Sequence, residues 1–433
     1  MMDFPPDTIL ELPSNISATY LSEGAANVVY TINVPPQSSA PEHGGTQEKA
    51  EDTAPNPWHG KLLRFRKDLP TTTPTLNAHI AFRTSIAPLF PAEDLIDIRL
   101  VSLGSSHLIQ TLNAALRAAE QPSSSTPRPK QRHGVYLADD PHALLITDMS
   151  PPTSATLIQF KPKWLAPSPS APPGSKRCRT CALHAKRGIQ KPSFCPLDLI
   201  SSSPDDVRRA AALLLGLPAS AATAATASTT TSTVSAAQNG SAVQNSSTTK
   251  TATQNGSVAN GNQNGAAVAT PHQLQTLPRL THWALTSPLL RHLRHIQTTC
   301  DPHGVSSLLS PSTPQPPSPS SLSGLQIAMT LRDVTVFLVV PDGEGVLRAR
   351  LGDLDVKSLG KVGEWGGVEG VLGGGWYQGS LGNEGEEGGG CWLGRVRERG
   401  EGGNGVGGKE GMGLRGGREV KERKKERGGC IGQ

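Results

Sequence analysis

The sequence predicts an α+β fold with a small, strand-rich N-terminal lobe and a larger lobe of mixed helices and strands. Three patterns support this prediction. The segments ISATYLSEGAANVVYTINV (16–34) and KLLRFRK (61–67) read as strands, the first interrupted by a glycine turn. Apolar residues at helical spacing follow in SSHLIQTLNAALRAAE (105–120) and again in LTHWALTSPLLRHLRHIQTTCD (280–301). The segments GLQIAMTLRDVTVFLVV (324–340) and LRARLGDLDVKS (347–358) look like paired strands.

The composition predicts long inserts within this fold. Aromatic residues make up only 4% of the 433 residues, against 46 glycines and 37 prolines, so much of the chain cannot bury a core. We expect an N-terminal lobe over residues 1–146 and a C-terminal lobe over 147–365. Disordered inserts are predicted at about 35–57, 218–270 and 305–323, followed by a disordered glycine-rich tail over 366–433.

Charge and cysteine content suggest the environment of the protein. The formal net charge of +5 favours an acidic partner without naming one. The first residues lack the basic and apolar regions of a signal peptide, and no run of 18 apolar residues is present. Six cysteines in so long a chain do not form a disulfide framework. We expect an intracellular protein, nuclear or cytoplasmic, that is monomeric and has no transmembrane segment.

Three of the cysteines lie together in CRTCALHAKRGIQKPSFC (178–195). Cys178 and Cys181 have the spacing that allows two thiolates to bind one tetrahedral ion. Cys195 can supply the third ligand and His184 the fourth, which would make a closed, structural zinc site. The other interpretation is a set of buried free thiols.

Other residues suit the binding of phosphate groups, although each has an ordinary alternative. The turn at Gly24 can bring backbone N–H groups close to a phosphate, or it can be a simple hairpin. Arg64 lies on a strand after this turn, and Lys161 and Lys163 share one face of another strand; all three can also be solvated surface residues. Asp333 stands in an apolar stretch, where an unpaired carboxylate is costly. It therefore needs a partner, such as a metal ion or a substrate hydroxyl.

Two further carboxylates suggest a magnesium site. Asp353 and Asp355 share a face of a short element, with Lys357 directly after them. Magnesium is usually held by one or two carboxylates together with substrate phosphates. An aspartate-rich turn is the alternative.

Taken together, the order of these segments resembles the inositol-pentakisphosphate 2-kinase family, particularly its fungal members. The resemblance extends over residues 20–377 in one collinear order. It consists of the pieces EGAANVVY, LLRFRK, PKQR before HALLITDM, FKPKWL, CRTCALH, FCPLDL, WALTSPLLRHLRHIQ, LRDVTVFL, LGDLDVKS and GGWYQG.

This resemblance implies a two-lobed, protein-kinase-like architecture. It also implies phosphoryl transfer from ATP to the 2-hydroxyl of inositol 1,3,4,5,6-pentakisphosphate, which gives inositol hexakisphosphate (phytic acid). Phosphoryl transfer depends on positioning and charge neutralisation, so a substrate with five phosphates requires a pocket rich in lysine and arginine.

The resemblance also implies individual roles. The loop over the ATP phosphates comprises Gly24, Ala25, Ala26 and Asn27, with Arg64 as the strand cation. The hinge beside the adenine comprises Thr147, Asp148 and Met149. The inositol phosphates are held by Arg132, Lys161, Lys163 and Lys357. Asp333 orients the attacking hydroxyl and could deprotonate it, while Asp353 binds magnesium, with Asp355 as the alternative ligand.

Two other functions remain open at this point. The family has an acidic residue where Gln159 stands, which leaves open a member that binds inositol phosphates without turnover. The cysteine cluster next to a basic surface also allows a zinc-containing nucleic-acid-binding protein. Because only Trp164 and Phe194 could stack on bases there, we expect no obligate nucleic-acid partner.

Overall fold

The computed structural model describes residues 8–35, 56–104, 107–151, 153–189, 193–219, 270–310, 317–381 and 390–399. Most of the inserts predicted at 35–57 and 218–270, and the predicted tail beyond 399, lie outside these described residues. Among the helices that are described, none is long and apolar enough to cross a membrane.

The smaller lobe is built on a six-stranded sheet with the strand order β1-β5-β6-β4-β3-β2. Its strands are β1 (Leu10–Glu11), β2 (Ser17–Glu23), β3 (Asn27–Asn33), β4 (Lys61–Arg66), β5 (Ile98–Ser102) and β6 (His142–Thr147). Its helices are α1 (Thr75–Ser85) and α2 (His107–Ala119), with the short 3-10 turns η1 (Ala87–Leu89), η2 (Ala92–Asp94) and η3 (Lys130–Arg132).

Both faces of this sheet are buried. Successive side chains of a strand point to opposite faces, and apolar residues of the central strands point to both. Leu63 and Leu145 face one side, where they pack with residues of α2. Leu62 and Leu144 face the other side and join the large core of the molecule. Apolar residues therefore occupy successive positions, Leu62 and Leu63 in β4 and residues 143–146 in β6, rather than every second position.

The larger lobe contains a three-stranded sheet of order β7-β8-β9, all antiparallel. Its strands are β7 (Ala155–Phe160), β8 (Thr335–Pro341) and β9 (Arg348–Gly352). The helices are α3 (Arg179–Lys186), α4 (Pro204–Leu214), α6 (Pro271–Thr286), α7 (Pro288–Cys300), α8 (Gly304–Leu308), α9 (Pro319–Leu331), α10 (Val362–Gly373) and α11 (Trp392–Glu398), with the 3-10 turns η4 (Asp198–Ile200) and η5 (Leu359–Lys361).

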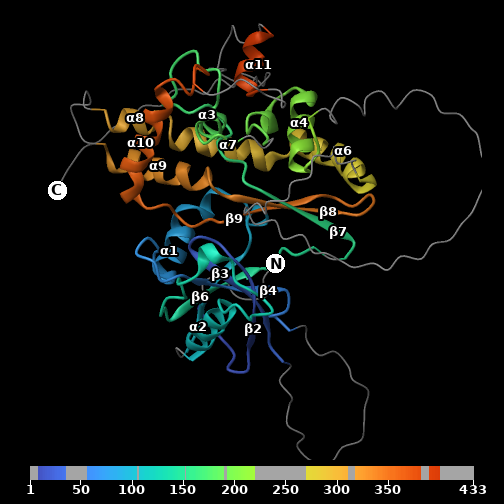
Figure 1. Cartoon of the computed structure of the whole chain (residues 1–433), viewed down its shortest axis with the longest axis vertical. Coiled ribbons are helices and arrows are strands. Elements are labelled where there is room, and N and C mark those ends of the chain that lie inside the picture. Colours follow the sequence, from blue (N-terminus) through green and yellow to red (C-terminus); the bar gives the residue numbers. More distant parts are fainter. Residues whose placement is uncertain are drawn as a thin grey trace, which may run out of the picture.

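The two lobes meet at this second sheet. Figure 1 shows the strands β7–β9 between the helices of the larger lobe, above, and the six-stranded sheet, below. The backbone N–H of Ile96, in the smaller lobe, donates to the carbonyl of Leu351 on β9 at 2.9 Å. The core is also continuous across the junction, since Ile146 and Leu293 belong to the same buried cluster. The chain thus has the predicted α+β fold with two lobes arranged as in protein kinases.

Three predicted boundaries are wrong. The strand expected over 324–340 begins only at Thr335, because residues up to Leu331 belong to helix α9. The insert expected at 305–323 is largely helical where it is described, because it contains α8 and the first turns of α9. Helix α9 packs closely on α7: a Cβ at Gly324 would collide with the carbonyl oxygen of Cys300. The tail expected from residue 366 also begins too early, since α10 continues to Gly373.

The glycine-rich segment is helical because of its tertiary packing. Trp365, Glu369 and Leu372 follow the period of a helix, and all three are buried. Glycine lowers helix propensity by about 1 kcal/mol per residue relative to alanine, which hides this helix from a composition-based reading. Tyr377, which follows α10, is also buried and donates a 2.6 Å hydrogen bond to Glu369.

Candidate active site and cysteine cluster

The glycine turn joins β2 to β3 in the smaller lobe. The backbone N–H of Gly24 donates to the carbonyl of Asn27 at 2.9 Å, and the N–H of Lys67 donates to the carbonyl of Ala26 at 2.8 Å. No atom outside the turn lies within 4 Å of the position that a Cβ on Gly24 would take. The surface over the turn is therefore open to a ligand.

A group of buried, charged side chains contacts this turn and stabilises it. Lys67 and Glu23 form an ion pair at 2.5 Å, and both side chains are only 1% exposed. The ammonium of Lys67 also donates to the carbonyl of Gly24 at 2.8 Å, while Arg128 pairs with Glu23 at 2.7 Å. Burial raises the pKa of Glu23, but the hydrogen bonds from Arg128 and Lys67 outweigh it, so that pKa lies below its ordinary value.

We predict that Lys67→Met lowers the free energy of unfolding by about 3 kcal/mol, because removing one partner of a buried ion pair leaves the other charge undercompensated. Urea unfolding measures this change. The control is Lys186→Met, on an exposed position of α3, which should change the same quantity by less than about 0.5 kcal/mol. Equal effects of the two variants would contradict the role assigned to Lys67.

An ion pair between Arg64 and Asp355 links the two lobes. Arg64, on β4, contacts the Asp355 carboxylate at 2.5 Å, and the Asn27 amide donates to the same carboxylate at 3.2 Å. The Nε of Arg64 is buried and has no hydrogen-bond partner within the part of the chain that the structure describes. A buried donor without a partner fits an anionic ligand that completes its hydrogen bonding.

The predicted hinge lies where the chain passes from one lobe to the other. Thr147 is the last residue of β6 and pairs with Lys61. The Asp148 N–H donates to the carbonyl of Gly60 at 3.0 Å, and Met149 packs on the main core.

The lysines and aspartates that form the second part of the site lie at one end of the three-stranded sheet. Because β7, β8 and β9 are antiparallel, the end of β7, the start of β8 and the end of β9 coincide. Lys161 and Lys163 follow β7, Asp333 precedes β8, and Asp353 follows β9. Residues far apart in the sequence are therefore neighbours in space.

Three lysines converge on Asp333. Lys163 contacts its Oδ1 at 2.9 Å, Lys161 contacts the same oxygen at 3.3 Å, and Lys357 contacts Oδ2 at 2.7 Å. Partial burial raises the pKa of Asp333, but the hydrogen bond from Lys357 and the charges of the lysines outweigh it and hold that pKa far below its usual range. The carboxylate is charged at every physiological pH.

Asp353 lies next to this cluster. It accepts a 2.6 Å hydrogen bond from the Thr335 hydroxyl and pairs with Lys161 at 3.4 Å. Asp353 and Lys163 are the two described residues other than glycine with positive φ, at 55° and 57°. Such backbone conformations cost about 1 kcal/mol or more and cluster at functional sites. Carboxylate oxygens are the ligands that magnesium prefers, so Asp353 and Asp355 fit this ion chemically.

Arg132 belongs to η3 in the smaller lobe, whereas the lysines around Asp333 belong to the larger lobe. Burial lowers the pKa of Lys67 and Glu23 opposes this effect, while the positive charge of Arg132 lowers that pKa further.

The cysteine cluster contains a different fourth member from the one predicted. The sulfur atoms of Cys178, Cys181, Cys195 and Cys391 all lie within 4.8 Å of one another. His184 is not among these four residues, and its ring makes a 2.9 Å hydrogen bond with the Ser193 hydroxyl. Cys391 comes from the segment before α11, which had been assigned to the disordered tail.

The spacing of the sulfur atoms fits a tetrahedral metal ion. The distances from Cys195 Sγ to Cys178 Sγ and to Cys391 Sγ are both 3.8 Å. With Zn–S bonds of about 2.3 Å, a tetrahedron has S–S edges of about 3.8 Å. The backbone N–H groups of Cys178 and Cys181 donate to Cys391 Sγ and Cys178 Sγ respectively, as expected around metal-bound thiolates.

Sequence reasoning missed Glu23, Lys67 and Cys391. Glu23 directly precedes the predicted turn, and Lys67 directly follows β4, the strand that carries Arg64; a charge beside an apolar strand was the available signal. For Cys391, the signal was a cysteine next to a tryptophan within a segment otherwise rich in glycine.

Two lobes joined at a hinge, an open glycine turn with a strand-borne cation, and carboxylates facing a group of lysines define a protein of the kinase-like class. Comparison with known families agrees with this assignment. The family model for inositol-pentakisphosphate 2-kinase matches residues 20–370, and the chain belongs to this family.

A curated relative carries the same description. A protein named inositol-pentakisphosphate 2-kinase from Yarrowia lipolytica is 54% identical to this chain over 44 residues. The matched segment covers 10% of this chain and 14% of that relative.

Proposed function

We propose that the protein is an ATP-dependent kinase that phosphorylates the 2-hydroxyl of inositol 1,3,4,5,6-pentakisphosphate and produces inositol hexakisphosphate. The observation that carries this proposal is the convergence of Lys161, Lys163 and Lys357 on Asp333. Several cations beside a carboxylate can bind a polyphosphate and orient a hydroxyl at the same place.

In this proposal, the lysines exchange one anionic partner for another. Without substrate, they pair with Asp333. Phosphate groups of the substrate carry more charge than a carboxylate, so they draw the ammonium groups of Lys161, Lys163 and Lys357 away from it. The carboxylate of Asp333 is then available to accept a hydrogen bond from the substrate hydroxyl and to take up its proton, as the new O–P bond forms and the bond between the γ-phosphorus of ATP and its bridging oxygen breaks, with ADP as the leaving group.

The nucleotide is assigned to the cleft side of the smaller lobe. Bound ATP would supply the γ-phosphoryl group, and Mg²⁺ would neutralise part of its charge. Backbone groups of the Gly24–Asn27 turn and the Arg64 guanidinium would hold the phosphates, and residues 147–149 would border the adenine. Asp353 would ligate magnesium, with Asp355 as the second candidate.

The four-cysteine cluster is assigned a structural zinc ion. A closed set of four thiolates leaves no position for a substrate, so the ion would stabilise the larger lobe without taking part in the reaction. Two further parts of the proposal rest on the sequence: the protein acts as a monomer, and it works inside the cell, in the nucleus or cytoplasm.

The direct test is an assay of the purified protein with ATP, magnesium and inositol pentakisphosphate. We expect inositol hexakisphosphate, with the new phosphate on the 2-position. Tight binding of the inositol phosphate without product would instead identify an inactive family member, consistent with Gln159. Saturable RNA binding with neither inositol-phosphate affinity nor turnover would contradict the proposal and favour the nucleic-acid alternative.

A further inference from the structure

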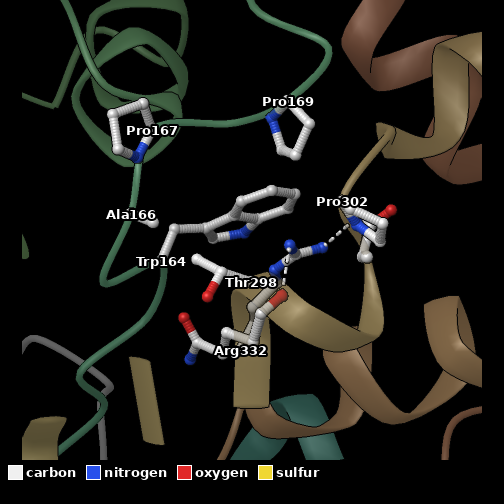
Figure 2. Close-up of a pocket in the computed structure, with 9 residues that line it drawn as sticks. Trp164, Ala166, Pro167, Pro169, Thr298, Pro302 and Arg332 are labelled. Carbon is white, nitrogen blue, oxygen red and sulfur yellow. Dashed lines mark hydrogen bonds and ion pairs between the residues drawn. The ribbon is translucent and has the colours of Figure 1, made fainter. Parts of the chain in front are cut away.

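The residues next to Lys163 and Asp333 contact each other. Trp164 follows the lysine and Arg332 precedes the aspartate, and both side chains are buried. The guanidinium carbon of Arg332 lies 3.6 Å from the centre of the Trp164 ring. Figure 2 shows the guanidinium against the face of the indole. This cation–π contact joins the two chain segments that carry the lysine and the carboxylate.

A single amide also bonds to both segments. The side-chain NH2 of Gln297, on α7, donates to the carbonyl of Lys163 at 2.9 Å and to the carbonyl of Leu331 at 3.0 Å. Its oxygen accepts from the N–H of Leu165 at 3.0 Å. Both amide donors are thus used on the main chain that flanks the site. One of them is bonded to the residue with a φ of 57°, so the amide stabilises an otherwise unfavourable backbone conformation.

The Arg332 guanidinium is fixed from other directions as well. It pairs with the buried Asp301 at 2.6 Å and donates to the carbonyl of Gln297 at 3.2 Å. Arg179, in the first turn of α3, also lies over the Trp164 ring at 4.6 Å. Because Cys178 is the N-cap of α3, this contact connects the cysteine cluster to the same group.

Several of these side chains border a small cavity. Trp164, Gln297, Asp301 and Arg332 line a cavity of about 140 Å³, shown in Figure 2. Neither Lys163 nor Asp333 lines this cavity. We therefore place the substrate at the lysines around Asp333 and not in this cavity, which lies beside the residues that support Lys163.

We infer that Gln297 and Arg332 are positioning residues that hold Lys163 in register with Asp333 for the reaction. This inference rests on the proposed kinase function and deepens it. A carboxylate that acts on the substrate hydroxyl and a cation that binds a phosphate group of the same substrate need fixed geometry, and a displacement of about 1 Å can lower a rate by about 100-fold.

The test combines kinetics with a double-mutant cycle. We expect Gln297→Met to lower kcat by about 100-fold, with a smaller change in KM for inositol pentakisphosphate. Arg332→Lys keeps the charge opposite Asp301 but loses the planar contact with Trp164, so it should lower kcat in the same direction. If Gln297 acts through Lys163, the combined loss in Gln297→Met/Lys163→Met is much smaller than the product of the two single losses.

The matched control is Asn113→Leu in the smaller lobe. The Asn113 amide also makes two hydrogen bonds to the main chain, donating to the carbonyl of Leu137 and accepting from its N–H. This variant should lower the melting temperature and leave kcat unchanged. A normal kcat in Gln297→Met, or losses that simply multiply in the cycle, would overturn the inference.

Hydrogen exchange provides a readout that needs no turnover. In Gln297→Met, the segments 161–166 and 331–335 should exchange faster than in the wild-type protein, while the strands of the smaller lobe remain unchanged. Unchanged exchange in both segments overturns the inference even if the wild-type protein is active. A wild-type protein without turnover overturns the proposed function. In that case, hydrogen exchange in Gln297→Met and its affinity for inositol hexakisphosphate, each compared with the wild-type protein, decide whether Gln297 is a positioning residue.

Discussion

Asp333→Asn is expected to lower kcat by about 1000-fold while the protein remains folded. Loss of a positioned proton acceptor costs 10²- to 10⁴-fold in general, and the amide has the same size as the carboxylate. The Asp333 side chain is 37% exposed, so the change leaves no cavity in the core.

The same variant should bind inositol pentakisphosphate at least as tightly as the wild-type protein. The reason is that Asp333 competes with substrate phosphates for Lys161, Lys163 and Lys357. Steady-state kinetics and calorimetric titration measure the two effects separately. Asp342→Asn is the control, because Asp342 lies just beyond the opposite end of β8 and is exposed. A near-normal kcat in Asp333→Asn would remove this carboxylate from the mechanism.

Cys391→Ser is expected to release the metal ion and to lower the free energy of unfolding by more than about 4 kcal/mol. Losses of this size are characteristic of a lost metal site. His184→Ala should retain about one zinc per chain, because the histidine ring bonds to Ser193 rather than lying within the sulfur cluster.

Metal analysis of the two variants distinguishes the cysteine set from the histidine-containing set predicted by the sequence. Cys300→Ser is the control for loss of a thiol, since Cys300 lies outside the cluster. A wild-type protein without bound metal would refute the zinc assignment and leave the kinase proposal untouched. Loss of zinc in His184→Ala but not in Cys391→Ser would reverse the ligand assignment.

Local patterns in the sequence predicted most of the strands and the polar residues at their ends, although residues 324–331, expected as strand, belong to helix α9. Lys161 and Lys163 were expected on one face of a strand, but they follow β7 and Lys163 has a φ of 57°, so the period of two does not extend to them. The contact of these lysines with Asp333, 172 and 170 positions away, depends on strand order, which local patterns do not encode. Only the collinear resemblance to a family suggested that these segments form one site.

The errors have a common physical cause. Glycine lowers the helix propensity of α10, yet Trp365, Glu369 and Leu372 have helical spacing and are buried by tertiary packing. Composition describes a segment in isolation, whereas the free energy of this helix comes from its neighbours. Isolated aromatic residues in a glycine-rich segment were the better guide, since such residues contribute most to a buried surface.

The ion pair between Arg64 and Asp355 affects how a measured nucleotide affinity is to be interpreted. Any anion that engages the Arg64 guanidinium competes for its charge with a carboxylate that already neutralises it and that also accepts a hydrogen bond from Asn27. An observed dissociation constant therefore reports the difference between two competing ion pairs. Added salt screens both pairs, so the net dependence on ionic strength is shallower than the charge of the ligand alone would suggest.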